Sequence, residues 1–244
     1  MADLDEVAPG IYRIACYGPE RRISFNQFLI DDERPTLVHT GHYAMYDEVR
    51  TAIAQVLDPA KLEVVVVTHF ESDECGSMDR FVGDAGHATL ACSALGAAVN
   101  LIPWDYRGEV QGMRDGERLE LGTHTLRFIE TPHVHHWDSM MVYEEATHGL
   151  FASDLFLQPG EQPAILRENL GKEMCDWYRT AGIFAAEAPV RDLINRLAGV
   201  EISCIHPGHG GSLPAELVPA YVKALRTQPF GFDGTIFGRR LPNA

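Results

Sequence analysis

Short runs of apolar residues recur along the chain and end at Gly, Pro, Asp or His, which is the pattern of buried β-strands bounded by turns. Several runs are rich in β-branched and aromatic residues, and one holds four consecutive valines at 64–67. The pattern predicts strands at 10–15, 25–30, 36–40, 63–69, 87–92, 124–130, 139–145, 149–154 and 201–206.

Other segments carry apolar residues at helical spacing. They predict helices at 45–57, around 75–84, at 188–199 and at 215–227, the last with a less regular start because of Pro219. Strands and helices alternate in each half, and a meander of strands occupies 119–154. This order predicts an α/β fold with helices outside two sheets, a four-layer αβ/βα sandwich, formed by one domain over 1–244. A doubly wound parallel sheet remains an alternative, although no GxGxxG or GxxxxGK[ST] phosphate loop is present.

Composition narrows the class of protein. The 244 residues carry a formal net charge of −15, which makes a nucleic-acid backbone a poor partner. No apolar stretch is long enough for a membrane span, and the acidic N-terminus lacks the apolar core of a secretory signal. The five cysteines are scattered and form no CxxC pair, so we expect a cytoplasmic protein without a disulfide framework.

Residues that can ligate a metal stand at four places, each where a predicted strand ends. They are His69, Glu71, Asp73 and Glu74 after the valine run, His133, His135 and His136 in TPHVHHWDS, Asp154 in LFASDLF, and His206 and His209 in HPGHGG. Alternate residues after a strand can point the same way, so His69 and Glu71 can share one metal. The next pair can turn toward a second metal, and Asp154 can bridge both with its two oxygens.

Each place also has a simpler explanation. Acidic residues stabilise a helix N-terminus, and Asp73 or Glu74, taken alone, fits that role about as well as a metal site. The histidines of TPHVHHWDS are individually compatible with a polar turn. The glycines of HPGHGG suit a tight loop, and an Asp after a strand is common. The four places together, in this order, are much harder to explain as unrelated features and predict a metal centre.

Taken in order, HxExDE, TPxxH, SD and PGHG resemble the motifs of the metallo-β-lactamase superfamily, whose first motif is usually HxHxDH. Glu71 moves the resemblance toward the flavodiiron proteins, whose first motif is HxExDH. FNQFLI resembles their YNxYLI strand, TPHVHHWDSM resembles their TPxxHWPDSM, and IHPGHG resembles their IAPSHG. The resemblance spans roughly residues 10 to 215.

The resemblance implies a ligand for each position of a diiron site. One iron is held by His69, Glu71 and His135, the other by Asp73, Glu74 and His209, and Asp154 bridges them. By the same resemblance His135, three residues after the Pro of TPxxH, is the ligand, and His133 and His136 are its neighbours. In PGHG, His209 takes precedence over His206.

Two residues depart from the family pattern. Glu74 stands where flavodiiron proteins have the final His of HxExDH, and His39 stands in LVHTG where the superfamily has the Asp of LVDTG. The sequence also shows no C-terminal flavodoxin domain, which in flavodiiron proteins holds FMN. In this respect it resembles the stand-alone oxygen-binding diiron proteins of bacterial chemotaxis.

The ligand chemistry favours iron. Glu71, Asp73, Glu74 and Asp154 carry four negative charges, which two divalent ions balance, and carboxylate-rich sites suit iron or manganese better than zinc. We therefore expect a non-haem diiron protein that binds dioxygen or a related small gas, for sensing or for slow reduction with an external electron donor or signalling partner. A homodimer is implied by the resemblance only, and 155–187 is where dimer or partner contacts are expected. The alternatives are a metal-dependent hydrolase acting on an ester, thioester or phosphodiester, and an interaction protein with a relic site.

Overall fold

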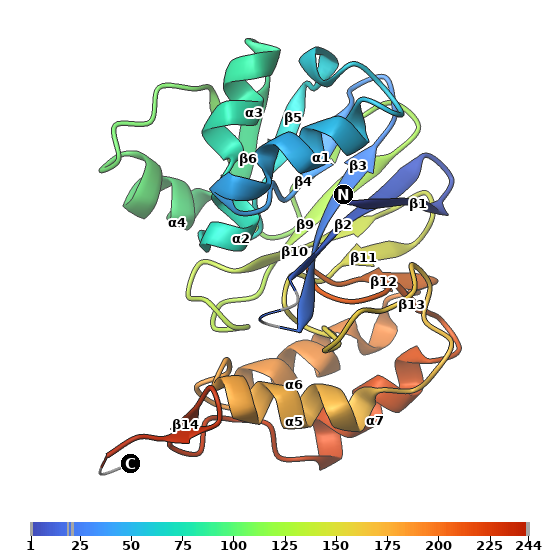
Figure 1. The fold of residues 1–244 in the computed structure, drawn as a ribbon, viewed down its shortest axis with the longest axis vertical. Coiled ribbons are helices and arrows are strands. Elements are labelled where there is room, and N and C mark those ends of the chain that lie inside the picture. The colour runs from blue at the N-terminus through green and yellow to red at the C-terminus, as the bar shows by residue number, and fades with distance from the viewer. Residues whose placement is uncertain (1, 19, 21, 243–244) are drawn as a thin grey trace.

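Two β-sheets lie face to face at the centre of the molecule, with helices outside each of them (Figure 1). The structure is a computed structural model that describes residues 2–18, 20 and 22–242. The first sheet has seven strands in the order β1 to β7, and the second has six strands in the order β13-β12-β11-β10-β9-β8. Helices α1, α3 and α4 lie beside the first sheet, whereas helices α5, α6 and α7 lie beside the second (Figure 1).

The first sheet begins as an antiparallel meander and continues as parallel strands, because helices connect its later members. Its strands are β1 (Asp3–Ala8), β2 (Ile11–Gly18), β3 (Ile23–Ile30), β4 (Thr36–Val38), β5 (Val64–Val66), β6 (Thr89–Ser93) and β7 (Val110–Met113). The second sheet is antiparallel except where β11 pairs with β12. Its strands are β8 (Arg118–Glu120), β9 (Thr125–Glu130), β10 (Met140–Glu144), β11 (Gly149–Phe151), β12 (Cys204–His206) and β13 (Leu213–Pro214).

The helices are amphipathic and short. They are α1 (Tyr46–Ile53), α2 (Ser72–Cys75), α3 (Met78–Ala85), α4 (Ala94–Gly96), α5 (Gly171–Ala181), α6 (Ala188–Arg196) and α7 (Val218–Thr227). Single turns η1 (Tyr43–Met45), η2 (Pro59–Lys61), η3 (Ala97–Leu101) and η4 (Leu197–Gly199) connect or extend them, and a small hairpin, β14 (Thr235–Ile236) with β15 (Arg239–Arg240), lies near the C-terminal end of the described chain.

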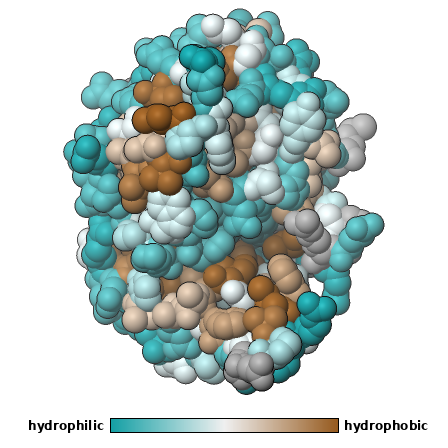
Figure 2. Space-filling view, turned by 90° about the vertical axis from the view of Figure 1, so that its left-hand side faces the viewer, coloured by the Kyte–Doolittle hydropathy of each residue, from teal (hydrophilic) through white to brown (hydrophobic). Residues whose placement is uncertain are grey.

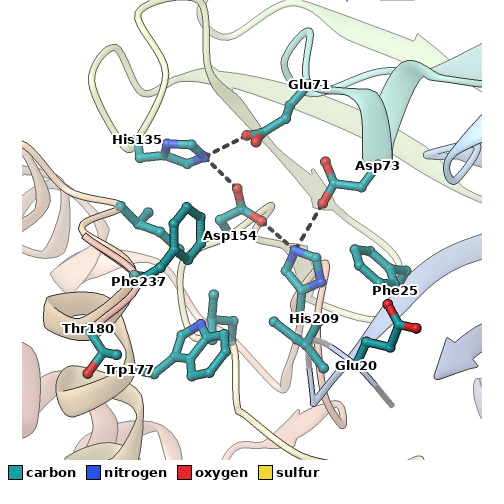
Figure 3. Close-up of a pocket in the computed structure, with 14 residues that line it drawn as sticks. Glu20, Phe25, Glu71, Asp73, His135, Asp154, Trp177, Thr180, His209 and Phe237 are labelled. Carbon is teal, nitrogen blue, oxygen red and sulfur yellow. Dashed lines mark ion pairs between the residues drawn. The ribbon is translucent and has the colours of Figure 1, made fainter. Parts of the chain in front are cut away.

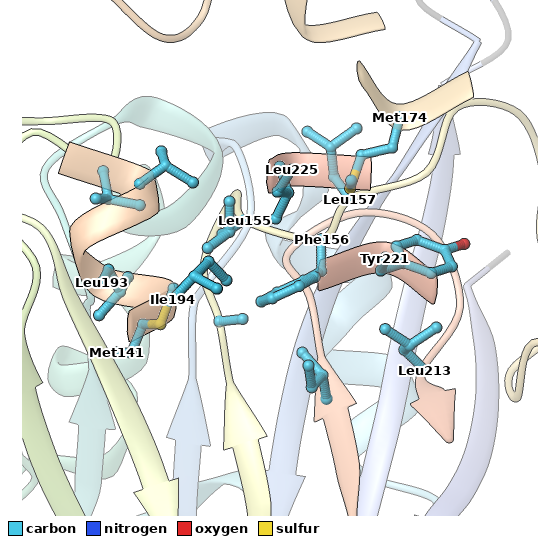
Figure 4. Close-up of a cluster of buried hydrophobic side chains, with 14 of the residues drawn as sticks. Met141, Leu155, Phe156, Leu157, Met174, Leu193, Ile194, Leu213, Tyr221 and Leu225 are labelled. Atoms are coloured by element: carbon cyan, nitrogen blue, oxygen red, sulfur yellow. The ribbon is translucent and has the colours of Figure 1, made fainter. Parts of the chain in front are cut away.

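Three apolar layers hold these elements together. One lies between the two sheets and includes Phe28, Val66 and Phe151, and a second packs α1 and α3 against the first sheet. The third packs α5, α6 and α7 against the second sheet through residues such as Met174 and Tyr221 (Figure 4). Two helix layers and two sheet layers with apolar contacts at each boundary make a four-layer αβ/βα sandwich.

The structure confirms the predicted fold class and excludes the doubly wound sheet. The predicted strands are present, but those at 36–40, 63–69, 149–154 and 201–206 are shorter, because the residues at one or both ends leave the sheet. The predicted helix around 75–84 is two helices, α2 and α3, separated near Gly76. Strands β1, β7 and β8 and helix α5 were not predicted. Strands β1, β7 and β8 lie at the edges of the two sheets, and they are too short or too polar to show a clear period.

Candidate metal centre

The predicted ligands meet because four loops leave the two sheets at the same end. His69 follows β5, His135 lies between β9 and β10, Asp154 follows β11, and His209 follows β12. Figure 3 shows His135, Glu71, Asp154, Asp73 and His209 in turn around one side of a pocket. The edge of a rigid sandwich therefore places side chains that are far apart in sequence within reach of one another.

Four ligand atoms converge on one point. Those of His69, Glu71, His135 and Asp154 all lie within 4.8 Å of one another. His135 Nε2 is 2.7 Å from Asp154 Oδ2 and 3.2 Å from Glu71 Oε2. His69 Nε2 is also 3.2 Å from Glu71 Oε2, and 3.6 Å from Asp154 Oδ2. Two imidazole nitrogens and two carboxylate oxygens at these separations can surround one cation.

A second group begins at the other oxygen of Asp154. His209 Nε2 lies 3.0 Å from Asp154 Oδ1 and 3.3 Å from Asp73 Oδ2 (Figure 3). Asp154 is 4% exposed and directs one carboxylate oxygen toward each group. This is the arrangement that a carboxylate adopts when it bridges two cations.

Hydrogen bonds fix which nitrogen each histidine presents. His209 Nδ1 lies 2.8 Å from the carbonyl oxygen of Ser24, which can only accept, so Nδ1 carries a proton and Nε2 of the neutral ring presents a lone pair. His69 Nδ1 lies 2.8 Å from Glu74 Oε2, and the same reasoning leaves its Nε2 free for a metal. In metal sites, partners of this kind orient the ring and make it a better ligand.

The buried carboxylates of the pocket favour the binding of cations. Burial alone would raise the pKa of Asp154, but the His135 and His209 rings outweigh burial and hold it well below its usual value. Burial alone would lower the pKa of His135, yet Asp154 and Glu71 raise it to about 9. His209 Nε2 and Asp154 Oδ1 are both acceptors when the ring is neutral, and Asp154 Oδ1 is buried without a hydrogen-bond donor. Cations between these atoms would satisfy them, so the residues present fit a dinuclear metal site.

Glu74 is the one predicted ligand whose side chain lies outside both groups of ligand atoms. Its side chain is 3% exposed and lies behind His69, where both oxygens accept hydrogen bonds from protein groups. Consecutive residues of a helix point about 100° apart. When Asp73 of α2 faces the pocket, Glu74 turns into the interior.

Four further histidines, three from the ligand motifs and His39 from LVHTG, lie outside the two groups. His206 is buried between Phe28 and Phe151 and bonds Ser212 Oγ through Nδ1, and burial lowers its pKa to about 4. His136 pairs with the Asp138 carboxylate, its ring centroid 5.5 Å from that of His69, and His133 is exposed. His39, buried at 2% exposure, lies behind the site with Nε2 3.4 Å from Glu74 Oε1.

The floor of a cavity of about 530 Å³ is formed by Glu71, Asp73, His135, Asp154 and His209, and its other walls are mostly apolar. Phe25, Trp177 and Phe237 lie around it, with Glu20 and Thr180 (Figure 3). The sequence did not identify the residues from α5 and the β14–β15 hairpin. The apolar spacing of 174, 175, 178 and 181 in α5 is a helical signal that could have revealed that element, although not its position over the metal centre.

One face of the molecule carries further exposed apolar side chains. The elements α4 and β14 lie at the left of Figure 1, so they belong to the face in Figure 2, where brown apolar groups gather in two areas separated by hydrophilic ones. Exposed apolar residues in these elements and next to them are Leu95, Val99, Ile102, Trp104 and Phe237.

None of the helices among the described residues has the length and apolar character needed to cross a bilayer.

Comparison with known proteins places the chain among relatives of the flavodiiron proteins. An uncharacterized protein of Methanocaldococcus jannaschii is 26% identical over 198 residues, which are 80% of this chain and 50% of that protein. The rubredoxin-oxygen oxidoreductase of Megalodesulfovibrio gigas is 31% identical over 136 residues, 55% of this chain and 34% of that protein. Among the first curated relatives, the matching part of the chain corresponds to half of their length or less.

Solved structures agree on the fold. The structure of rubredoxin oxygen:oxidoreductase from Desulfovibrio gigas superposes with a TM-score of 0.83 at 24% identity, over 91% of this chain and 60% of that one. A family model described as "ODP family beta lactamase" matches residues 23–210, most of the chain. The chain therefore belongs to the ODP family, the metallo-β-lactamase-like domain of flavodiiron proteins.

Proposed function

We propose that this protein is a non-haem diiron protein that binds dioxygen, or a related small gas, for sensing or slow reduction. The observation that carries the proposal is Asp154, whose two oxygens lie 2.7 Å from His135 Nε2 and 3.0 Å from His209 Nε2. One cation would be held by His69, Glu71, His135 and Asp154, and the other by Asp73, His209 and Asp154.

The donor set supports iron over zinc. Three carboxylates and three imidazoles surround the two positions, and no described cysteine lines the pocket. Hard anionic ligands stabilise the oxidised state of iron, whereas hydrolytic zinc works best with fewer negative ligands. When bound, a reduced iron pair supplies the electrons that dioxygen takes up.

The protein itself supplies binding and exclusion of water. Phe25, Leu157 and Trp177 offer apolar walls that favour an uncharged gas over ions. The His209 ring is held by Ser24, so its Nε2 stays directed at Asp154. The pocket is therefore preorganised on its ligand side and mostly apolar on its other walls.

The relative of Megalodesulfovibrio gigas is named as an oxidoreductase acting between rubredoxin and oxygen. By analogy, we infer that electrons reach this domain from a separate redox protein, or that a signalling partner reads its state. A homodimer and a cytoplasmic location belong to the same proposal.

The proposal is tested by purifying the protein without air, measuring iron, zinc and manganese, and recording the visible spectrum before and after air is admitted. We expect about two irons per chain, one for each group of ligands, and a new near-ultraviolet or visible band after exposure to oxygen. Two zincs per chain and an unchanged spectrum would contradict the proposal. A matched Asp154→Asn variant, which keeps the shape of the side chain, should give little bound iron and no band.

The size of the cavity supports one alternative function, that of a metal-dependent hydrolase. Its volume of about 530 Å³ is many times the roughly 30 Å³ that one water molecule occupies in the liquid, so an organic substrate would also fit. Glu71 argues against hydrolysis because it adds negative charge at the metal. Turnover of chromogenic ester, thioester and phosphodiester substrates by the zinc-loaded protein, lost in Asp154→Asn, would favour the hydrolase instead.

A further inference from the structure

We propose that Glu74 is a positioning residue for His69 and not a ligand of the second metal, which leaves that metal with only Asp73, His209 and Asp154 from the protein. The inference rests on the proposed dinuclear site. It concerns the residue that departs from the family's first motif, and it follows from contacts behind the pocket.

The Glu74 carboxylate is surrounded by hydrogen-bond donors. Oε2 lies 2.8 Å from His69 Nδ1, accepts the Thr68 hydroxyl at 2.8 Å and accepts the His69 backbone N–H at 3.1 Å. Oε1 accepts the Ser153 hydroxyl at 2.8 Å. With its lone pairs directed at these protein groups, the carboxylate has no oxygen left for a metal in the pocket.

The backbone holds Glu74 in this orientation. Its carbonyl oxygen accepts hydrogen bonds from both the backbone N–H and the hydroxyl of Thr40, at 2.8 and 2.9 Å. Helix α2 has only four residues, and these two bonds fasten it to the segment after β4. A rotation that carried Glu74 into the pocket would break them and would withdraw Asp73 from His209.

His39 completes the arrangement from the opposite side. Its Nε2 lies 2.9 Å from Thr68 Oγ1, and because the Thr68 hydroxyl donates to Glu74, it accepts from His39. His39 Nε2 is also 3.4 Å from Glu74 Oε1. The two residues that depart from the family pattern, Glu74 and His39, are thus neighbours that stabilise each other behind His69.

This arrangement assigns Glu74 to one metal only. It fixes the proton of His69 on Nδ1, directs Nε2 toward Glu71 and Asp154, and adds a negative charge that makes the imidazole a stronger ligand. Ser153, next to the bridging Asp154, contacts the same carboxylate and His69 Nδ1 at 3.0 Å. Loss of Glu74 should therefore weaken the His69 position and spare the Asp73–His209 position.

The test separates the two positions with background variants. In Asp73→Asn only the His69 position should bind Fe(II) tightly, and in His135→Ala only the Asp73–His209 position should do so. Glu74→Gln keeps the shape of the side chain and removes its charge. Anaerobic Fe(II) titration should show an affinity about 10- to 100-fold weaker when Glu74→Gln is added to Asp73→Asn, and an unchanged affinity when it is added to His135→Ala.

Asp32→Asn is the matched control, because Asp32 also forms a buried pair with a histidine, His124, at 2.8 Å, but outside the metal centre. It should lower stability without changing Fe(II) affinity. An unchanged affinity for Glu74→Gln in the Asp73→Asn background, or a loss confined to the His135→Ala background, would overturn the inference. If the unsubstituted protein binds fewer than two metals, the proposed dinuclear site fails instead.

A second measurement needs no substitution at Glu74. In the protein loaded with Zn(II), which is diamagnetic, a proton–nitrogen correlation NMR spectrum should show His69 protonated on Nδ1, with a strongly downfield proton protected from exchange. His69 bound to the metal through Nδ1, or without a proton there, would overturn the positioning role.

Discussion

Replacement of Asp32 by Asn tests how the structure holds two loops together at the edge of the sheets. Asp32 accepts backbone N–H groups of Glu33, Thr123 and His124 at 2.8, 3.1 and 2.7 Å, and its Oδ2 lies 2.8 Å from His124 Nδ1. Burial alone would raise the pKa of Asp32, but these donors outweigh burial and lower it from 3.8 to about 2. A carboxylate with a lowered pKa stabilises the folded state only while it is ionised.

The pKa difference gives the size of the effect. At about 1.4 kcal/mol per pKa unit, a shift from 3.8 to about 2 corresponds to about 2 kcal/mol of stability at neutral pH. Because the folded-state pKa is the lower one, this contribution is present above 3.8 and is lost as the pH falls through 2. At pH 3 roughly half of it should remain.

The assay is urea unfolding of the metal-free protein, kept in chelator so that metal binding does not alter the midpoint. Asp32→Asn should lower the free energy of unfolding by about 2 kcal/mol at pH 7, and the difference from the unsubstituted protein should shrink between pH 5 and pH 3. Equal stabilities at pH 7, or a difference that does not change with pH, would refute this account of the Asp32 site.

Two further substitutions test the site and the core. Asp154→Ala removes the carboxylate shared by both groups of ligands, so elemental analysis should find most of the bound metal lost, and full retention would refute the bridging role. Phe28, 1% exposed, packs against Phe151 between the two sheets with ring centroids 5.3 Å apart. In urea unfolding, Phe28→Ala should lower the free energy of unfolding by about 3–5 kcal/mol. Phe232 is 41% exposed, so the control Phe232→Ala should change this free energy little. Equal effects of the two substitutions would contradict the packing described for the sheet interface.

The sequence predicted the fold class because its strongest signals are local. The valine run of β5 and the apolar runs of β3 and β10 are buried on both sides and show this in their composition. Strand β7 has three exposed residues of four, and β8 has only three residues, so neither has a period to detect. Their places depend on the neighbouring strands, which local sequence does not encode.

In the metal centre, too, the sequence motifs predicted some features, whereas others depend on tertiary packing. Motif order brought His69, His135 and Asp154 into one hypothesis, and the structure places their ligand atoms together. The orientation of Glu74 could not be read from HxExDE, because it depends on where a four-residue helix is fastened to Thr40. The apolar wall from α5 also depends on tertiary packing, since Trp177 meets the pocket only when that helix covers the second sheet.

The most direct test of the central claim is crystallography of the anaerobically purified protein at the iron absorption edge. We predict two anomalous peaks about 3.5–4 Å apart, one within bonding distance of His69 Nε2, Glu71 and His135 and the other next to Asp73 and His209, with Asp154 between them. A single peak, or two peaks that appear at the zinc edge and not at the iron edge, would contradict the diiron site.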